Sequence, residues 1–291
     1  MKRFLKVLLT AILLVGLVLC SVGCGEGRNA KEETPGLKYK KDADTGFYTI
    51  YGYVQEQDVY ELDLGKATDK DGNAIVVGKI ASGAFSGNDA LTKIIVPDTV
   101  TEISAGAFKN MNSLEELVLP FIGKTANSDA YPDETNGEGK SKDVEKSTNI
   151  ERTLAYLFGT EAYDKGAKVT VKYGTETAEY YIPAYFKKVT VKVKTSEEYS
   201  IPMYAFSGMG LIREVELCEG VVAIGDNAFS SCHDLTNVVI PSSVTKIYKE
   251  AFKDSENFGK NLSADELSAL KTKIDSLANG YDIYVGTYLD K

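Results

Sequence analysis

Few residues of this 291-residue chain have the types and the spacing that chemistry requires. The single histidine, His233, cannot form a zinc site alone, and no H-E-x-x-H or C-x-x-C motif accompanies it. No G-x-S-x-G or reactive-cysteine context supplies a nucleophile for it to activate. Glu115 and Glu116 could in principle act as the carboxylate pair of a glycosidase, but one of two adjacent strand residues simply faces solvent. The sequence therefore predicts a protein that is not an enzyme and has no catalytic residue, metal ligand or cofactor.

The run Asp69–Asn73 has the acidic residues of a calcium loop. The EF-hand pattern would need an oxygen ligand at Ala67, whose side chain has none. Asp, Asn and Gly also favour tight turns, so the sequence favours a hairpin turn at this position.

Cys24 is the residue for which the sequence predicts a covalent modification. Lys2 and Arg3 precede an apolar stretch at 8–19, which is typical of an export signal and short for a membrane-spanning helix. The segment 21–24, Ser-Val-Gly-Cys, then resembles a bacterial lipobox, in which the cysteine thiol receives a diacylglycerol. Because two acyl chains anchor a protein stably, we expect a lipid anchor on the extracellular face of the bacterial cell membrane. Secretion with cleavage nearby is the alternative.

The dipeptide Ala-Phe recurs at an interval of 23 residues and defines an internal repeat. An isoleucine stands five residues before each phenylalanine, and an apolar-x-apolar step follows each pair. The step predicts a short strand with alternate residues pointing inward. Stacked units of this kind predict a solenoid whose strands form a parallel sheet, with a rise of about 4.8 Å per coil. The pairs are Ala84-Phe85, Ala107-Phe108, Ala205-Phe206, Ala228-Phe229 and Ala251-Phe252.

Residues 224–241 carry the clearest copy of the repeat, with Ala228-Phe229 near its start and Cys232 in its turn. This copy resembles the BspA-like branch of leucine-rich repeat proteins, whose units have the form I-x-x-x-A-F-x-x-C-x-x-L-x-x-I-x-I-P. The resemblance implies a mainly β solenoid, poor in helix, that stacks in a right-handed manner. It also implies adhesion or contact with host proteins as the function.

An insert separates the second and third clear units. It is polar at 124–149, predicts a short helix at 154–159, and alternates like strands at 169–173 and 189–193. Tyr180–Pro183 fits a degenerate repeat, with Phe186 and Val189 in the following positions. We therefore expect the insert to belong to the same solenoid.

Both ends of the stack need covers, because the outermost coils would otherwise expose the core. Aromatic and apolar residues at 46–64 suggest paired strands, and a capping box at Ser263–Glu266 begins a helix that ends near Gly280, followed by a strand at 281–288. The predicted organisation is a signal peptide at 1–23, a lipidated tether at 24–45, an N-terminal β cap at 46–79, repeats at 80–120, the insert at 121–200, repeats at 201–258 and a C-terminal helix–strand cap at 259–291.

Eight strand residues are predicted to point away from the core. Three of the four central ones are apolar, and such a stripe is typical of a protein-binding strip. The alternative is strand propensity alone, because Val and Ile favour these positions anyway. The predicted strip has Ile95, Val118, Glu216 and Val239 at its centre and Lys93, Glu116, Glu214 and Asn237 beside them.

These observations predict a surface-anchored, non-catalytic protein that binds other macromolecules, with a protein as the expected ligand. The alternative is a glycan-binding accessory of the cell envelope. Loss of Lys2, Arg3 and Lys6 with the signal takes the formal charge from −9 to −12, so we expect no nucleic-acid binding and membrane contact only through the lipid. No bridge is expected between Cys218 and Cys232, which lie in different parts of the repeat.

Overall fold

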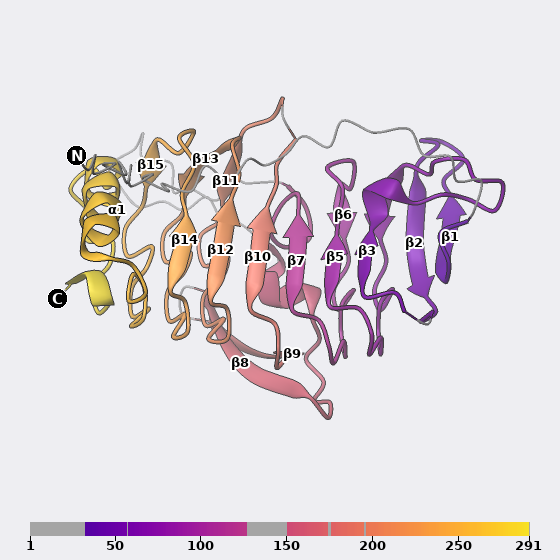
Figure 1. Cartoon of the computed structure of the whole chain (residues 1–291), viewed down its shortest axis with the longest axis horizontal. Helices are drawn as coiled ribbons and strands as arrows, with labels where there is room; N and C mark the ends of the chain where they lie inside the picture. The colour runs from indigo at the N-terminus through magenta and orange to yellow at the C-terminus, as the bar shows by residue number, and fades with distance from the viewer. Residues whose placement is uncertain (1–32, 57, 127–149, 174–175, 195, 291) are drawn as a thin grey trace, which may run out of the picture.

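The computed structural model describes residues 33–56, 58–126, 150–173, 176–194 and 196–290, so the predicted export signal and Cys24 lie outside the described residues. The chain forms an elongated stack of β coils that ends in the helix α1 (Ala264–Leu277) (Figure 1). The architecture is a mainly β solenoid, which confirms the fold that the repeat predicted.

One parallel sheet of six strands runs along the stack (Figure 1). Each strand is short because a coil contributes one apolar-x-apolar step and then turns. The first apolar residue of the step is buried beside its equivalent in the next coil, as Ile94 is beside Leu117. In spatial order the strands are β14 (Asn237–Val239), β12 (Glu214–Leu217), β10 (Lys188–Val191), β7 (Glu116–Leu119), β5 (Lys93–Ile95) and β3 (Glu61–Asp63).

Two smaller sheets form around the isoleucine that precedes each Ala-Phe pair. All five of these isoleucines are fully buried and lie in strands, so each regular coil carries a second strand. One sheet contains β1 (Leu37–Lys41), β2 (Tyr48–Tyr53), β4 (Val77–Ile80) and β6 (Glu102–Ile103). The other contains β11 (Tyr199–Ile201), β13 (Val221–Ile224) and β15 (Lys246–Ile247).

The phenylalanine rings of the repeat stack on one another inside the coils. Phe85 and Phe108 lie 5.5 Å apart between ring centroids, and Phe229 lies 4.7 Å from Phe206 and 5.1 Å from Phe252. All five rings are fully buried. This row of rings confirms that the Ala-Phe pairs occupy equivalent places in one continuous core.

The insert contributes one further coil. The amide of Phe108 donates to the carbonyl of Leu157, just as the amide of Phe85 donates to the carbonyl of Ala107. Leu157 and Phe158 therefore take the place of an Ala-Phe pair, at the end of the 3-10 helix η4 (Leu154–Leu157), which follows η3 (Ile150–Arg152). Farther along, β10 lies between β7 and β12 in the main sheet. The prediction that the insert belongs to the solenoid is thus confirmed.

An antiparallel hairpin leaves the stack within this coil (Figure 1). It consists of β8 (Gly166–Tyr173) and β9 (Glu176–Pro183). Tyr180–Pro183, the predicted degenerate repeat, forms the end of β9 and pairs with β8, and Tyr181 also bridges to Gly159 of the insert coil. Phe186, just before β10, and Val189, within it, do take their predicted places and are fully buried.

The N-terminal end differs from the sequence prediction in two ways. The tether does not extend to residue 45, because Leu37 is buried and the Tyr39 ring lies 5.6 Å from that of Tyr48, which joins β1 to β2 in an antiparallel pair. The segment 46–79 is also more than a cap. Strands β3 and β4 pair in parallel with β5 and β6, so the segment builds the first coil, with the 3-10 helix η1 (Leu64–Lys66) in its turn.

The C-terminal end is covered by α1 and by the chain that follows it. Ser263 and Glu266 form the predicted capping box. The predicted strand at 281–288 was wrong: the carbonyls of Asp282, Ile283 and Val285 accept bonds from the turn of the last coil, so the segment follows the shape of that turn. The 3-10 helix η5 (Tyr288–Asp290) comes last.

Candidate binding surface

Two rows of side chains line the solvent face of the main sheet. The strand register places equivalent residues of successive coils side by side. The predicted strip is therefore brought together, but four residues that the sequence did not assign join it. The outer row is Glu61, Lys93, Glu116, Lys188, Glu214 and Asn237, and the central row is Asp63, Ile95, Val118, Thr190, Glu216 and Val239.

The outer row alternates in charge along the sheet. Lys93 pairs with Glu116 at 3.2 Å between nitrogen and oxygen, and Lys188 lies 4.0 Å from Glu216 in the central row. One residue earlier in the coils, Lys187 pairs with Glu115. Partly exposed ion pairs contribute about 0–1 kcal/mol each, so their main effect is to favour one register of the coils.

The central row is not one continuous apolar stripe. Ile95 and Val118 lie side by side and Thr190 follows Val118 in the row, but Glu216 separates these three from Val239. Val118 is only 9% exposed and Thr190 only 8%, so both contribute less surface than Ile95 does. The apolar patch therefore comprises Ile95, Val118 and Thr190, bordered by the paired charges of the outer row.

The four added residues could have been found from weaker signals. Lys188 and Thr190 flank the alternating Val189 in the insert, a strand that the sequence predicted but did not place in the sheet. Glu61 and Asp63 flank the buried Leu62 in a segment interpreted as a cap. Only the pairing of strands shows that they continue the same rows.

The residues considered for chemistry occupy ordinary structural positions. His233 is exposed in a turn, and its backbone carbonyl accepts a 2.7 Å bond from the Asn257 side chain. Glu115 and Glu116 each pair with a lysine of a neighbouring coil. Cys232 is a buried free thiol, so the predicted absence of a bridge to Cys218 is confirmed. Among the described residues, no group of three His, Cys, Asp or Glu side chains could hold a metal ion.

Asp69 holds a turn, as the sequence favoured. Its carboxylate accepts the amides of Asp71 at 2.9 Å and Asn73 at 2.8 Å, between residues Thr68 and Ala74, which form an antiparallel bridge. The bond from Asn73 holds the pKa of the Asp69 carboxyl below its usual value. These bonds give the Asp69 carboxylate a structural role in the turn.

Comparison with protein families identifies the repeat. The model of the BspA-type leucine-rich repeat region matches residues 76–158 and 168–272 in six copies, which together cover more than half of the chain. No curated protein matches the chain significantly. In the part of the chain that the structure describes, no helix is both long enough and apolar enough to cross a membrane.

Solved structures of bacterial leucine-rich repeat proteins are similar to the chain. A leucine-rich cell surface protein from Faecalibacterium prausnitzii is 19% identical, covers 79% of this chain and 48% of its own, and has a TM-score of 0.34. A leucine-rich repeat protein from Eubacterium ventriosum is 16% identical. The match covers 90% of this chain and 55% of that protein, with a TM-score of 0.41. The chain thus spans about half the length of these structures, and the fold assignment rests on the repeat itself.

Proposed function

Because the chain belongs to the BspA-type leucine-rich repeat family, we propose that it is a surface-anchored protein that binds another protein through the solvent face of its main sheet. The observation that carries this proposal is the patch of Ile95, Val118 and Thr190 within the ladder of paired charges. An apolar centre with a polar rim is the usual composition of a protein interface. The lipid on Cys24 would hold this face outside the cell.

The size of the sheet also supports a macromolecular ligand. Six parallel strands present one broad surface, and neighbouring residues of it come from coils far apart in sequence. Lys188 and Thr190, at its centre, come from the insert. A partner that contacts several coils at once would meet the alternating charges of the outer row. A protein whose charges do not complement this pattern would be disfavoured, because like charges would then face each other.

The test compares variants of the full chain in a pull-down from intact cells, with the captured proteins identified by mass spectrometry. We expect Ile95→Thr/Val118→Thr to lose a specific partner that the unchanged protein captures. Val239→Thr is the matched control, because Val239 lies in the same row but outside the patch. A partner captured equally by all three proteins, with unchanged thermal unfolding, would place the interface elsewhere.

Anchoring needs a separate test. Metabolic labelling with a fatty-acid analogue should label the unchanged chain and leave Cys24→Ala unlabelled. Export without any label would support secretion with cleavage in place of a lipoprotein.

A further inference from the structure

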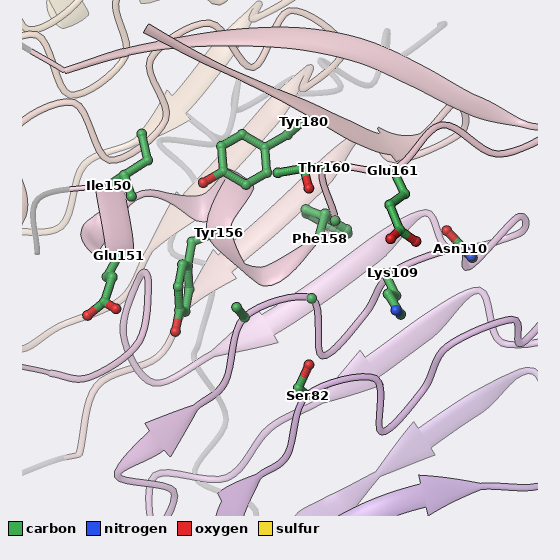
Figure 2. Close-up of a pocket in the computed structure, with 13 residues that line it drawn as sticks. Ser82, Lys109, Asn110, Ile150, Glu151, Tyr156, Phe158, Thr160, Glu161 and Tyr180 are labelled. Atoms are coloured by element: carbon green, nitrogen blue, oxygen red, sulfur yellow. The ribbon is translucent and has the colours of Figure 1, made fainter. Parts of the chain in front are cut away.

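A cleft of about 320 Å³ opens where the insert meets the regular turns, away from the main sheet (Figure 2). This volume lies within the range of small-molecule sites. Turns of the first coils form one wall and the insert forms the other, so the cleft exists only because the insert leaves the repeat pattern. Ser82, Lys109 and Asn110 lie on the first wall, and Tyr156, Thr160, Glu161 and Tyr180 lie on the second.

Lys109 is held along a column of three glycines. A Cβ atom at Gly159 would lie 3.2 Å from the Lys109 Cβ, one at Gly106 would lie 3.5 Å from its Cδ, and one at Gly83 would lie 3.7 Å from its Cε. Because these glycines have no side chains, the aliphatic part of the Lys109 side chain can lie directly along their backbone. No carboxylate of the described residues pairs with Lys109. A positioned, unpaired ammonium group therefore faces the cleft.

Tyr180 brings a hydroxyl group that lacks a partner. The residue is only 7% exposed, and within the described part of the chain its hydroxyl makes no hydrogen bond. Tyr156, by contrast, bonds the backbone of Ala105. Because this hydroxyl borders the cleft without a protein partner, a ligand in the cleft can supply its hydrogen bond.

We propose that the cleft binds a neutral sugar residue of a glycan. Uncharged polar groups line it, from Ser82, Asn110, Tyr156, Thr160 and Tyr180. The charged groups of the lining are Lys109, Glu161 and Glu151, and Glu151 is already paired with Lys124. Each sugar hydroxyl both donates and accepts, which suits this mixed set. Glu161 would repel an anionic ligand and Lys109 a cationic one, while the rings of Tyr156 and Tyr180 offer apolar surface to the sugar C–H groups.

The proposal is tested with saturation-transfer NMR on the full chain. The probes are the methyl glycosides of glucose, galactose, mannose and N-acetylglucosamine at millimolar concentration, with glycine and alanine as zwitterionic competitors. We expect at least one glycoside to bind, and Tyr180→Phe to bind it about tenfold more weakly, which is the effect of one hydrogen bond. Lys109→Met keeps the stem over the glycines and should also weaken binding.

Tyr181→Phe is the matched control, because Tyr181 is next to Tyr180 on β9 and points to the other face of the hairpin. It should bind as the unchanged protein does. The proposal is overturned if no glycoside binds, if the amino acids bind instead, or if Tyr180→Phe and Lys109→Met match Tyr181→Phe.

Discussion

At the scale of the residue, single side chains tie each coil to the next. The hydroxyl of Ser255 donates to the carbonyl of Phe229 and accepts the amide of Cys232 at 3.1 Å. The Cys232 thiol donates in turn to the carbonyl of Phe206 at 3.0 Å. Burial raises the pKa of this thiol, so it stays a neutral donor. The positions three residues after Phe229 and Phe252 therefore carry bonds between coils as well as packing.

Truncation of a stacked ring tests the core row. Phe229→Ala should lower the free energy of unfolding by about 3–5 kcal/mol, because it leaves a cavity between two rings. The measurement is urea unfolding. Phe47→Ala, at a ring that is 41% exposed, should cost much less, and equal losses would contradict the continuous core.

The Glu219 carboxylate makes the contact between its coil and the next one dependent on pH. It accepts the hydroxyl of Ser242 at 2.7 Å and the amides of Ser242 and Ser243, and the hydroxyl bond is the main cause that lowers its pKa. A lowered folded-state pKa adds stability above the pKa of the unfolded chain, and this stability is lost as the pH falls through the folded value.

Glu219→Gln should therefore be less stable than the unchanged protein at neutral pH and should approach it in acid. Thermal unfolding followed from neutral to acidic pH measures the difference. If the difference in unfolding temperature between the two proteins does not change with pH, the charge of Glu219 is not what stabilises this contact.

At the scale of the element, the insert coil shows how a solenoid accepts a hairpin. Leu157-Phe158 keeps the ring position and β10 keeps the strand position, so the hairpin β8–β9 is added between them without breaking the stack. Its inner face is buried at Val169, Val171 and Tyr180, and its outer face carries the Lys168–Glu179 pair. The hairpin therefore packs against the turns and forms one wall of the cleft.

A glycine permits this packing. Gly208 has a φ of +73°, and a Cβ atom there would lie 2.0 Å from the Thr170 carbonyl oxygen in β8. Gly208→Ala should displace the hairpin and speed its cleavage in limited proteolysis. Gly87→Ala is the matched control, since Gly87 has a φ of +75° and no atom within 4 Å of the added carbon. Equal proteolysis of the two variants would show that backbone strain alone matters.

At the scale of the whole molecule, both ends of the stack are closed by chain that departs from the repeat. At the N-terminus β1 pairs antiparallel with β2, and its lysines lie on an edge strand, where charge disfavours pairing with other molecules. At the C-terminus α1 covers the last coil, with Ile274 fully buried and Lys273 bonding the carbonyl of Ile240. Closed ends leave the side surfaces of the stack exposed to solvent.

Disruption of the C-terminal cover should expose the stack. Ile274→Asp places a charge in the buried contact of α1, so we expect a lower unfolding temperature and self-association in light scattering. Ser276→Asp, at an exposed position of the same helix, should stay monodisperse and keep its unfolding temperature. Identical behaviour of the two variants would mean that α1 does not protect the core.

The sequence by itself determined the repeat, its buried rings and the inward residues of the regular strands. This was possible because a constant interval puts like residues at like places in every coil, so the pattern of one coil predicts the others. Ile212 shows the limit. It is 1% exposed and takes the position where the repeat has leucine, whereas the neighbouring Leu211 is only partly buried.

Only the tertiary structure decided where the insert enters the stack, which residues complete the two rows on the sheet, and that a cleft exists. Phe158, Lys188 and Thr190 follow no fixed interval, because the insert adds chain before and after its ring. The partners of these residues lie in other coils, and a sequence pattern specifies spacing along the chain but not contact across an insertion of variable length. The candidate surfaces therefore depend on a packing choice that the repeat alone does not encode.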